Sequence, residues 1–462
     1  MSAARPRLCL LALVASLAGC AVGPDYVAPT LPLPADFATR QSPVPASQDW
    51  WRIFGDPVLD RLVAEALAAN RDLAVAAARI EQARAQVALA RADQLPSAGI
   101  DASRSRERSS ELGAFPLPPE AILTNTNRAV LRLSWELDFW GKYRRASEAA
   151  RSELLAAEAS RDAVRASLVA DVARAHFALQ ALDANRAIAL TTLEGRRLAL
   201  DLLRERLKAG VSSGLEVAQF ESEMRGAEAG VPVLERDRTR QEGALAVLLG
   251  RSPAAVYAAA IERGNAAAPQ AVEVPAGLPS DLLRRRPDLR EAEARLIAAN
   301  ARIGVARAAY YPSISLTGFL GGQSQSLTDL FSGPARTWSL AGGLLQPLYG
   351  GGQIRGGVDL AEARTREAAA RYEAAVAQAF KEVRDAIAAQ STAREILSAR
   401  RAREQSLARA RDLAKLRHDG GLASLFEVLD AERQLLEVRL EANNAERDRR
   451  GAMVDLYLAL GS

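Results

Sequence analysis

The 462-residue sequence has few of the residues that usually carry catalysis. It contains two cysteines and two histidines, and aromatic residues make up 5% of it. A catalytic or metal centre built on histidine and cysteine therefore has little to draw on. No run of 18 or more apolar residues occurs after position 20, which argues against a membrane-spanning helix there. Sixty Lys and Arg face 56 Asp and Glu, and this net charge of +4 does not indicate nucleic-acid binding.

The first 19 residues predict an export signal. Arg5 and Arg7 precede an apolar run that is too short for a stop-transfer helix. The run ends in Leu17-Ala18-Gly19-Cys20, which is similar to the bacterial lipobox. We therefore expect residues 1–19 to be a lipoprotein signal peptide and Cys20 to be lipidated. A secretory signal with an incidental cysteine is the alternative.

Residue 21 is alanine rather than aspartate, which indicates sorting toward the outer membrane. The prolines that follow disfavour a helix, so residues 20–55 are expected to form a lipidated, extended tether.

The rest of the chain aligns with itself. At an offset of 211, Gly210 matches Gly421 and Glu216 matches Glu427, with no gap needed from about 133 to 250. Upstream the offset is 216. A period this long indicates a duplicated unit rather than a solenoid. The repeats are expected at 56–260 and 281–462, with a linker at 261–280.

Each repeat predicts one helix, two strands and two long helices. The strands show alternating apolar and polar residues, and the long helices show coiled-coil spacing. Pro232 should kink or break its helix. In the first repeat these elements are expected at about 57–94, 97–139 and 145–250, and in the second at about 281–309, 313–348 and 355–460, with strand-connecting loops at 109–127 and 326–335.

The four amphipathic strands of one chain are too few to form a closed membrane barrel. Unpaired strand edges are costly in hydrocarbon, and closed membrane barrels have at least about eight strands. We therefore infer that several chains each contribute four strands to one barrel.

At this point the chain resembles the TolC-like outer membrane factors, specifically the OprM/NodT-type efflux lipoproteins. The resemblance covers the mature chain and rests on the lipobox and on four further motifs, which are WWRIFGDP at 50–57, RPDL at 286–289, AAYYPSISL at 308–316, and the LLG at 248–250 that is echoed by LG at 460–461. It implies a fold that is mainly α with a transmembrane β-barrel portion. It also implies a homotrimer with a 12-stranded barrel in the outer membrane and a 12-helix barrel across the periplasm.

The resemblance also implies roles for the turns between the long helices. These turns are expected to contact a periplasmic adaptor through Gly210, Val211, Ser212, Ser213, Gly421, Leu422 and Ser424. Asp430 matches the family's constriction aspartate, and Glu427 matches an acidic ring found in part of the family. The first repeat has Gln219 at the position equivalent to Asp430, so the acidic ring is one-sided. A solvated helix charge is the alternative for Asp430.

Other motifs do not predict chemistry. The GVSSG at 210–214 matches the nucleophile-elbow pattern but stands between helices rather than after a strand. The glycines at 350–352 lack the lysine and the spacing of a phosphate loop. His176 and His418 lie on separate elements without further metal ligands. Trp135, Trp140 and Trp338 fit an interfacial belt or a core equally.

The sequence thus predicts a passive exit duct of a tripartite efflux system for drugs or other small toxic compounds. Its partners are a periplasmic adaptor, an inner-membrane pump and outer-membrane lipids, and no motif predicts a cofactor, a metal, nucleic-acid binding or an enzyme. The alternatives are a duct for metal ions or for type I protein secretion, and, in a different class, a structural coiled-coil lipoprotein without a channel.

Overall fold

The computed structural model describes residues 21–34, 49–112, 118–258, 260–263 and 279–461. Cys20, the signal peptide and most of the linker at 261–280 lie outside the described residues. The chain divides into two compact units. Unit 1 combines Arg79–Glu158 and Glu291–Glu373 with the N-terminal residues up to Thr30, and unit 2 comprises Leu31–Ala78, Ala159–Arg290 and Ala374–Ser462.

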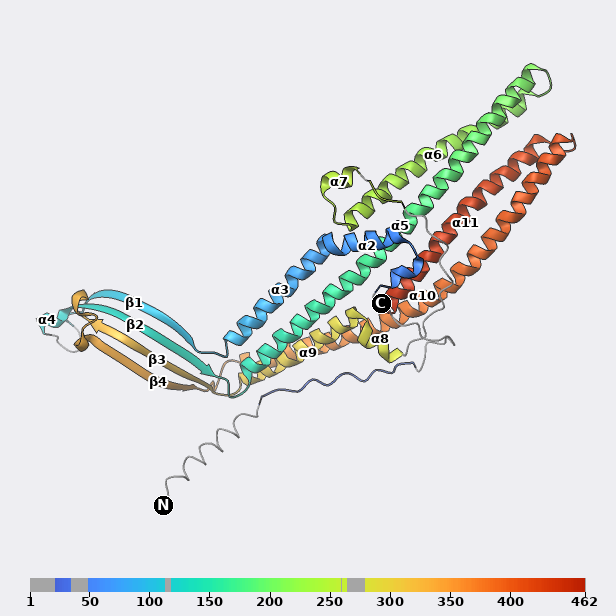
Figure 1. Ribbon diagram of the computed structural model, residues 1–462. Helices are drawn as coiled ribbons and strands as arrows, with labels where there is room; N and C mark the ends of the chain where they lie inside the picture. The colour runs from blue at the N-terminus through green and yellow to red at the C-terminus, as the bar shows by residue number, and fades with distance from the viewer. Residues whose placement is uncertain (1–20, 35–48, 113–117, 259, 264–278, 462) are drawn as a thin grey trace. The chain divides into compact units, whose positions relative to one another are not determined.

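Corresponding helices of the two expected repeats have equal lengths (Figure 1). The first long helices have 67 residues each, the returning helices 35 each, and the helices before the strands 22 each. In that order they are α5 (Lys142–Lys208) and α10 (Gln353–Asp419), α6 (Gly214–Leu248) and α11 (Leu425–Ala459), and α3 (Arg71–Ala92) and α9 (Pro287–Ala308).

The four strands form one antiparallel sheet in the order β1-β2-β3-β4. They are β1 (Ser97–Arg108), β2 (Leu123–Leu137), β3 (Ser313–Ser324) and β4 (Arg336–Leu345). β2 begins inside the loop expected at 109–127, and β4 ends a little before the expected position 348. Several apolar residues of the expected alternation are exposed, among them Leu133 in β2 and Leu340 in β4.

The shorter elements are α2 (Pro57–Ala69), α4 (Pro119–Ile122), α7 (Pro253–Ala258), α8 (Pro279–Arg285) and three 3-10 helices, η1 (Trp50–Phe54), η2 (Leu327–Asp329) and η3 (Gly333–Ala335). Within the described part of the chain, no helix is both long and apolar enough to cross a membrane.

The helix expected at 57–94 is interrupted, which corrects the sequence prediction. Asn70 separates α2 from α3, and its side-chain oxygen accepts hydrogen bonds from the backbone N–H groups of Asp72 and Leu73. Such a cap replaces the helical partners that the first N–H groups of α3 lack. In the second repeat, Pro287 produces the matching break between α8 and α9, because proline disfavours helix at the residue before it.

The two breaks make equivalent contacts in unit 2. The Asn70 side chain donates to the carbonyl of Leu248, and the Arg286 side chain donates to the carbonyl of Ala459, which is 211 positions after Leu248. Beside them, Gly250 and Gly461 have φ of +69° and +77° and lie directly against the two breaks. A Cβ on Gly250 would lie 2.1 Å from the Ala69 carbonyl oxygen, so glycine is required there.

The core of unit 2 forms where η1 and α2 pack on the long helices. Trp50 is stacked on Tyr457 at 5.5 Å between ring centroids, and Phe54 contacts Phe177 at 4.7 Å. The last part of the tether expected at 20–55 is therefore not extended but forms η1. α6 continues through Pro232, so that proline does not break its helix.

The N-terminal residues of unit 1 lie along its helices without helix or strand of their own. The Val22 N–H donates to the carbonyl of Trp140, and the Asn300 side chain donates to the carbonyl of Pro24. Trp140 itself stacks on Tyr311, whereas Trp338 is 72% exposed. The sequence left a core position and an interfacial position open for the tryptophans. In the structure Trp140 is packed against another ring, and Trp338 lies on the surface.

Candidate periplasmic gate and hairpin tips

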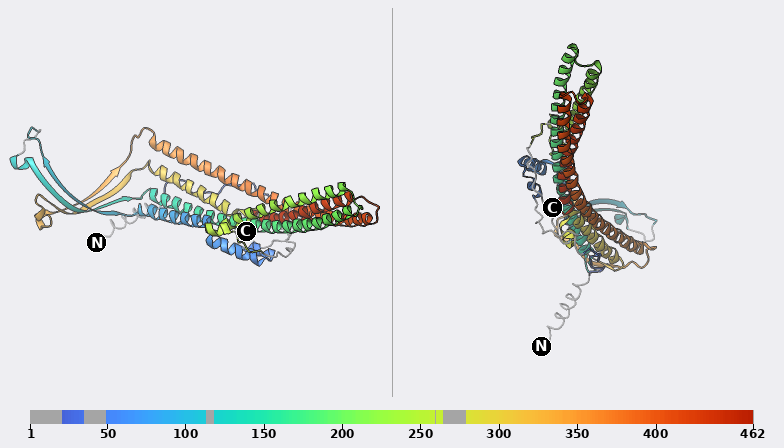
Figure 2. Two further views of the ribbon diagram at one scale, coloured as in Figure 1. Left: turned by 90° about the horizontal axis from the view of Figure 1, so that it is seen from above. Right: turned by 90° about the vertical axis from the view of Figure 1, so that its right-hand side faces the viewer.

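The long helices form two hairpins whose tips lie at the same end of unit 2 (Figures 1 and 2). Near the tips the hairpins pack on each other, because Leu425 and Leu429 of α11 belong to one buried cluster with Leu200 of α5 and Phe220 and Met224 of α6. Leu200, Phe220 and Met224 lie on the coiled-coil spacing predicted from the sequence, whereas Leu425 and Leu429 do not.

The two tips reverse the chain in the same way. Gly210 and Gly421 have φ of +74° and +72°, a region that residues with a Cβ rarely adopt. After each glycine the backbone N–H donates back into the preceding helix, from Val211 to Arg206 and from Leu422 to Arg417. Val211 and Leu422 are each 75% exposed, so both tips present an apolar side chain to solvent.

The tips differ at their following helix starts. Ser213 and Glu216 form a complete capping box, with the Ser213 Oγ accepting from the Glu216 N–H and the Glu216 carboxylate accepting from the Ser213 N–H. Ser424 makes no side-chain cap, and Glu427 instead pairs with Arg417 at 3.2 Å. The same pair of residue types therefore performs different tasks in the two repeats.

Asp430 lies one turn beyond Glu427 on α11 and is partly exposed. Its carboxylate accepts from the Arg433 guanidinium at 2.7 Å and from the Gln434 amide at 2.6 Å. The Arg433 hydrogen bond, followed by that of Gln434, lowers the pKa of Asp430 below its usual range. The carboxylate therefore stays ionised at neutral and mildly acidic pH. Asp430 and Glu427 thus lie near one tip, together with basic partners that sequence reasoning did not identify.

His176 has a partner that the sequence did not reveal. Its Nε2 lies 2.8 Å from the carboxylate of Asp56, and both side chains are buried. Asp56 also caps α2 by accepting from the N–H groups of Val58 and Leu59. The only sequence signal was an aspartate before a proline, which is typical of a helix start. The Nδ1 of His418 donates to the carbonyl oxygen of Ala423 within the second tip. Among the described residues no group of three potential metal ligands occurs.

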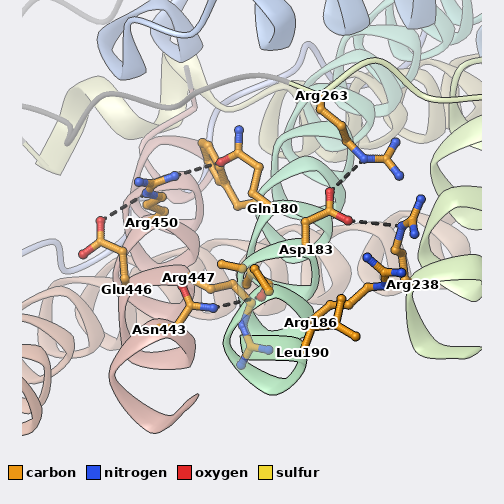
Figure 3. A pocket seen from close by; sticks show the side chains of 14 residues that line it. Gln180, Asp183, Arg186, Leu190, Arg238, Arg263, Asn443, Glu446, Arg447 and Arg450 are labelled. Carbon is orange, nitrogen blue, oxygen red and sulfur yellow. Dashed lines mark hydrogen bonds and ion pairs between the residues drawn. The ribbon is translucent and has the colours of Figure 1, made fainter. Parts of the chain in front are cut away.

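A groove of about 750 Å³ lies between α5, α6 and α11 (Figure 3). Five arginines line it, but acidic residues neutralise them. Asp183 pairs with Arg238 and Arg263, and Glu446 pairs with Arg450, which also donates to Gln180. Arg186 pairs with Glu235 on α6. This network connects helices and offers little free charge to a ligand.

The comparisons with known proteins agree with this architecture. The chain matches the outer membrane efflux protein family over residues 62–251 and 278–462. It is 36% identical over 458 residues to the antibiotic efflux pump outer membrane protein ArpC of Pseudomonas putida, covering 96% of this chain and 93% of that protein. It is 33% identical over 452 residues to the cation efflux system protein CusC of Escherichia coli O6:H1, covering 96% of both.

Among solved structures, the CmeC outer membrane channel of Campylobacter jejuni superimposes with a TM-score of 0.92 at 28% identity, covering 96% of this chain and 95% of that one. The expected fold class, mainly helical with a β-barrel portion, is thereby confirmed. Channels of this family form trimers and work with periplasmic adaptors and inner-membrane pumps. The chain belongs to the outer membrane efflux protein family and is an outer-membrane component of a tripartite efflux system.

Proposed function

We propose that this chain forms the exit duct for small toxic organic compounds, drugs among them, and performs no chemistry of its own. The observation that carries the proposal is the pair of matched hairpins, whose glycine turns place exposed apolar residues at one end of unit 2. An adaptor of complementary shape would bury Val211 and Leu422 there. The relative named for antibiotic efflux supports an organic substrate.

Transport of cations is the second candidate, because the relative named for cation efflux is nearly as similar. A susceptibility panel on a strain lacking this gene separates the two. We expect sensitivity to antibiotics, dyes or solvents that the wild-type gene restores. Sensitivity confined to metal salts would favour the cation duct, and a defect in secreted protein alone would favour protein export.

We propose that Asp430, with Glu427 beside it, lines the periplasmic constriction. Three copies of an ionised carboxylate at a narrow point would attract cations and repel anions. Asp430→Ala should raise the closed-state conductance in planar bilayers, because it removes the acceptor that holds Arg433 and Gln434. Asp412→Ala is the matched control, since Asp412 is an exposed acid on α10 that pairs with Arg411. A single-channel current that Asp430→Ala leaves unchanged contradicts this assignment.

Lipidation of Cys20 is part of the proposal and is supported by the lipobox alone. Mass spectrometry of the mature N-terminus checks it, and an unmodified alanine or cysteine start would reject it. The reading as a structural lipoprotein without a channel is tested in the same bilayers. Complete lack of conductance, even in Asp430→Ala, would favour that reading.

A further inference from the structure

A second cavity, of about 350 Å³, lies in unit 2 beside the junction of α8 and α9. The helix α5 forms one wall, and the indoles of Trp50 and Trp51 form another. Gly461, near the C-terminus, closes it on a third side. Because both tryptophans are almost fully buried in the core, these walls are fixed by packing.

The cavity has a surplus of positive charge. Four arginines line it, Arg161 and Arg165 from α5 and Arg285 and Arg290 from the α8–α9 junction, against a single acid, Asp162. Asp162 pairs with Arg161 and, at 3.5 Å, with Arg290. Within the described residues, Arg165 and Arg285 have no acidic partner. In the groove of Figure 3, by contrast, each of the five arginines has an acidic partner, which is Asp183, Glu446, Glu235 or Asp448.

The duplication shows that the fold does not need these arginines. At the offsets that relate the repeats, Arg161 and Arg165 correspond to Tyr372 and Val376, and Arg285 and Arg290 correspond to Ala69 and Ala74. The other repeat is helical at all four positions and has no basic residue at any of them. Four arginines against one aspartate leave a net charge of +3 around the cavity, which favours an anion there. Their presence in one repeat alone therefore indicates a ligand.

We propose that this cavity is a binding site for a small multivalent oxyanion, carrying phosphate or carboxylate groups. Guanidinium groups bind both groups through paired N–H donors, and arginine is preferred to lysine where such forked geometry matters. The fixed indole walls limit the site to a small ligand. None of the residues that line this cavity belongs to the hairpin tips or to the Glu427–Asp430 segment, so the proposal goes beyond the proposed function.

Isothermal titration of the full-length protein in detergent, with inorganic pyrophosphate and with citrate as probes, tests the proposal. We expect saturable binding with one site per chain, weakened by added salt. Arg165→Gln and Arg285→Gln should each weaken binding about tenfold, because each removes a charge-assisted hydrogen bond to the anion. Arg165→Lys should fall between wild type and Arg165→Gln, since it keeps the charge and loses the fork.

Arg384→Gln is the matched control, because Arg384 is an 84% exposed arginine of unit 2 outside the cavity. This variant also loses one positive charge, and it should bind both anions as tightly as the wild-type protein. Helical content and trimer size are measured for every variant, so that loss of folding is recognised. Wild-type protein that binds neither probe, or an equal loss in Arg384→Gln, overturns the proposal. The conductance and susceptibility results are unaffected by either outcome.

Discussion

At the scale of single residues, the Asp56–His176 pair connects the start of α2 to the centre of α5. Burial by itself would raise the pKa of Asp56, but the hydrogen bond and charge of His176, together with the N–H groups of Leu59 and Val58, lower it well below its usual range. A group whose folded pKa is lowered stabilises the fold above its unfolded pKa. This contribution is therefore complete above about pH 4 and is lost as the pH falls further.

Substitution of Asp56 tests this pair. Asp56→Ala should lower the free energy of unfolding by about 3 kcal/mol, because it leaves His176 buried without its partner and removes the cap of α2. Asp56→Asn should cost less, since the amide oxygen can still cap the helix. The loss of helical signal on heating, measured by circular dichroism at pH 7, gives the order of stability. Equal stability of Asp56→Ala and wild type would refute a stabilising role.

At the scale of elements, the two hairpins form an internal comparison. Ser213 caps α6 through a capping box, whereas Ser424 makes no side-chain cap on α11. Ser213→Ala should destabilise the start of α6 by about 1 kcal/mol, which corresponds to roughly fivefold faster local amide exchange. Ser424→Ala should leave the start of α11 unchanged. Hydrogen exchange with mass spectrometry of the tip peptides measures both, and equal effects in the two variants would contradict the difference.

The helices could be predicted from the sequence where the spacing of neighbouring apolar residues determines them. The spacing of apolar residues in α5 predicted the seam that the structure buries, including Leu193, Leu200 and Leu203. The break at Asn70 was missed because its cause is partly distant, a carbonyl on Leu248. In the other repeat Arg286 makes the equivalent contact, so the two repeats share a geometry but not a residue type. The offset of 216 aligns Asn70 with Arg286, but the sequence alone does not show that an asparagine and an arginine make the same contact.

The candidate site was predictable in a similar measure. The glycine turns were evident because a tight reversal needs positive φ, as at Gly210 and Gly421. The partners of the acidic residues were not evident from the sequence. Glu427 pairs with Arg417, while its equivalent Glu216 caps the start of its helix. Which of these tasks an identical residue performs depends on side-chain geometry that spacing does not specify.

At the scale of the whole molecule, the four-stranded sheet has two open edges. Among the residues that the structure describes, β1 and β4 each pair on one side only, with β2 and β3 respectively. Exposed edges of this length leave a row of unsatisfied backbone groups, which is untenable in a membrane. Because the channels of this family form trimers, we infer that β1 of one copy pairs with β4 of the next.

Cysteine pairs test this closure. The mature chain is expected to keep only Cys20, so introduced cysteines report cleanly. Ser103→Cys in β1 is combined in turn with Thr337→Cys, Ser339→Cys or Ala341→Cys in β4, because the register between copies must be scanned. At least one combination should yield disulfide-linked dimers and trimers on non-reducing gels of outer membranes. Each single cysteine variant is its control, and monomer alone in every combination would mean that the sheet closes in another way.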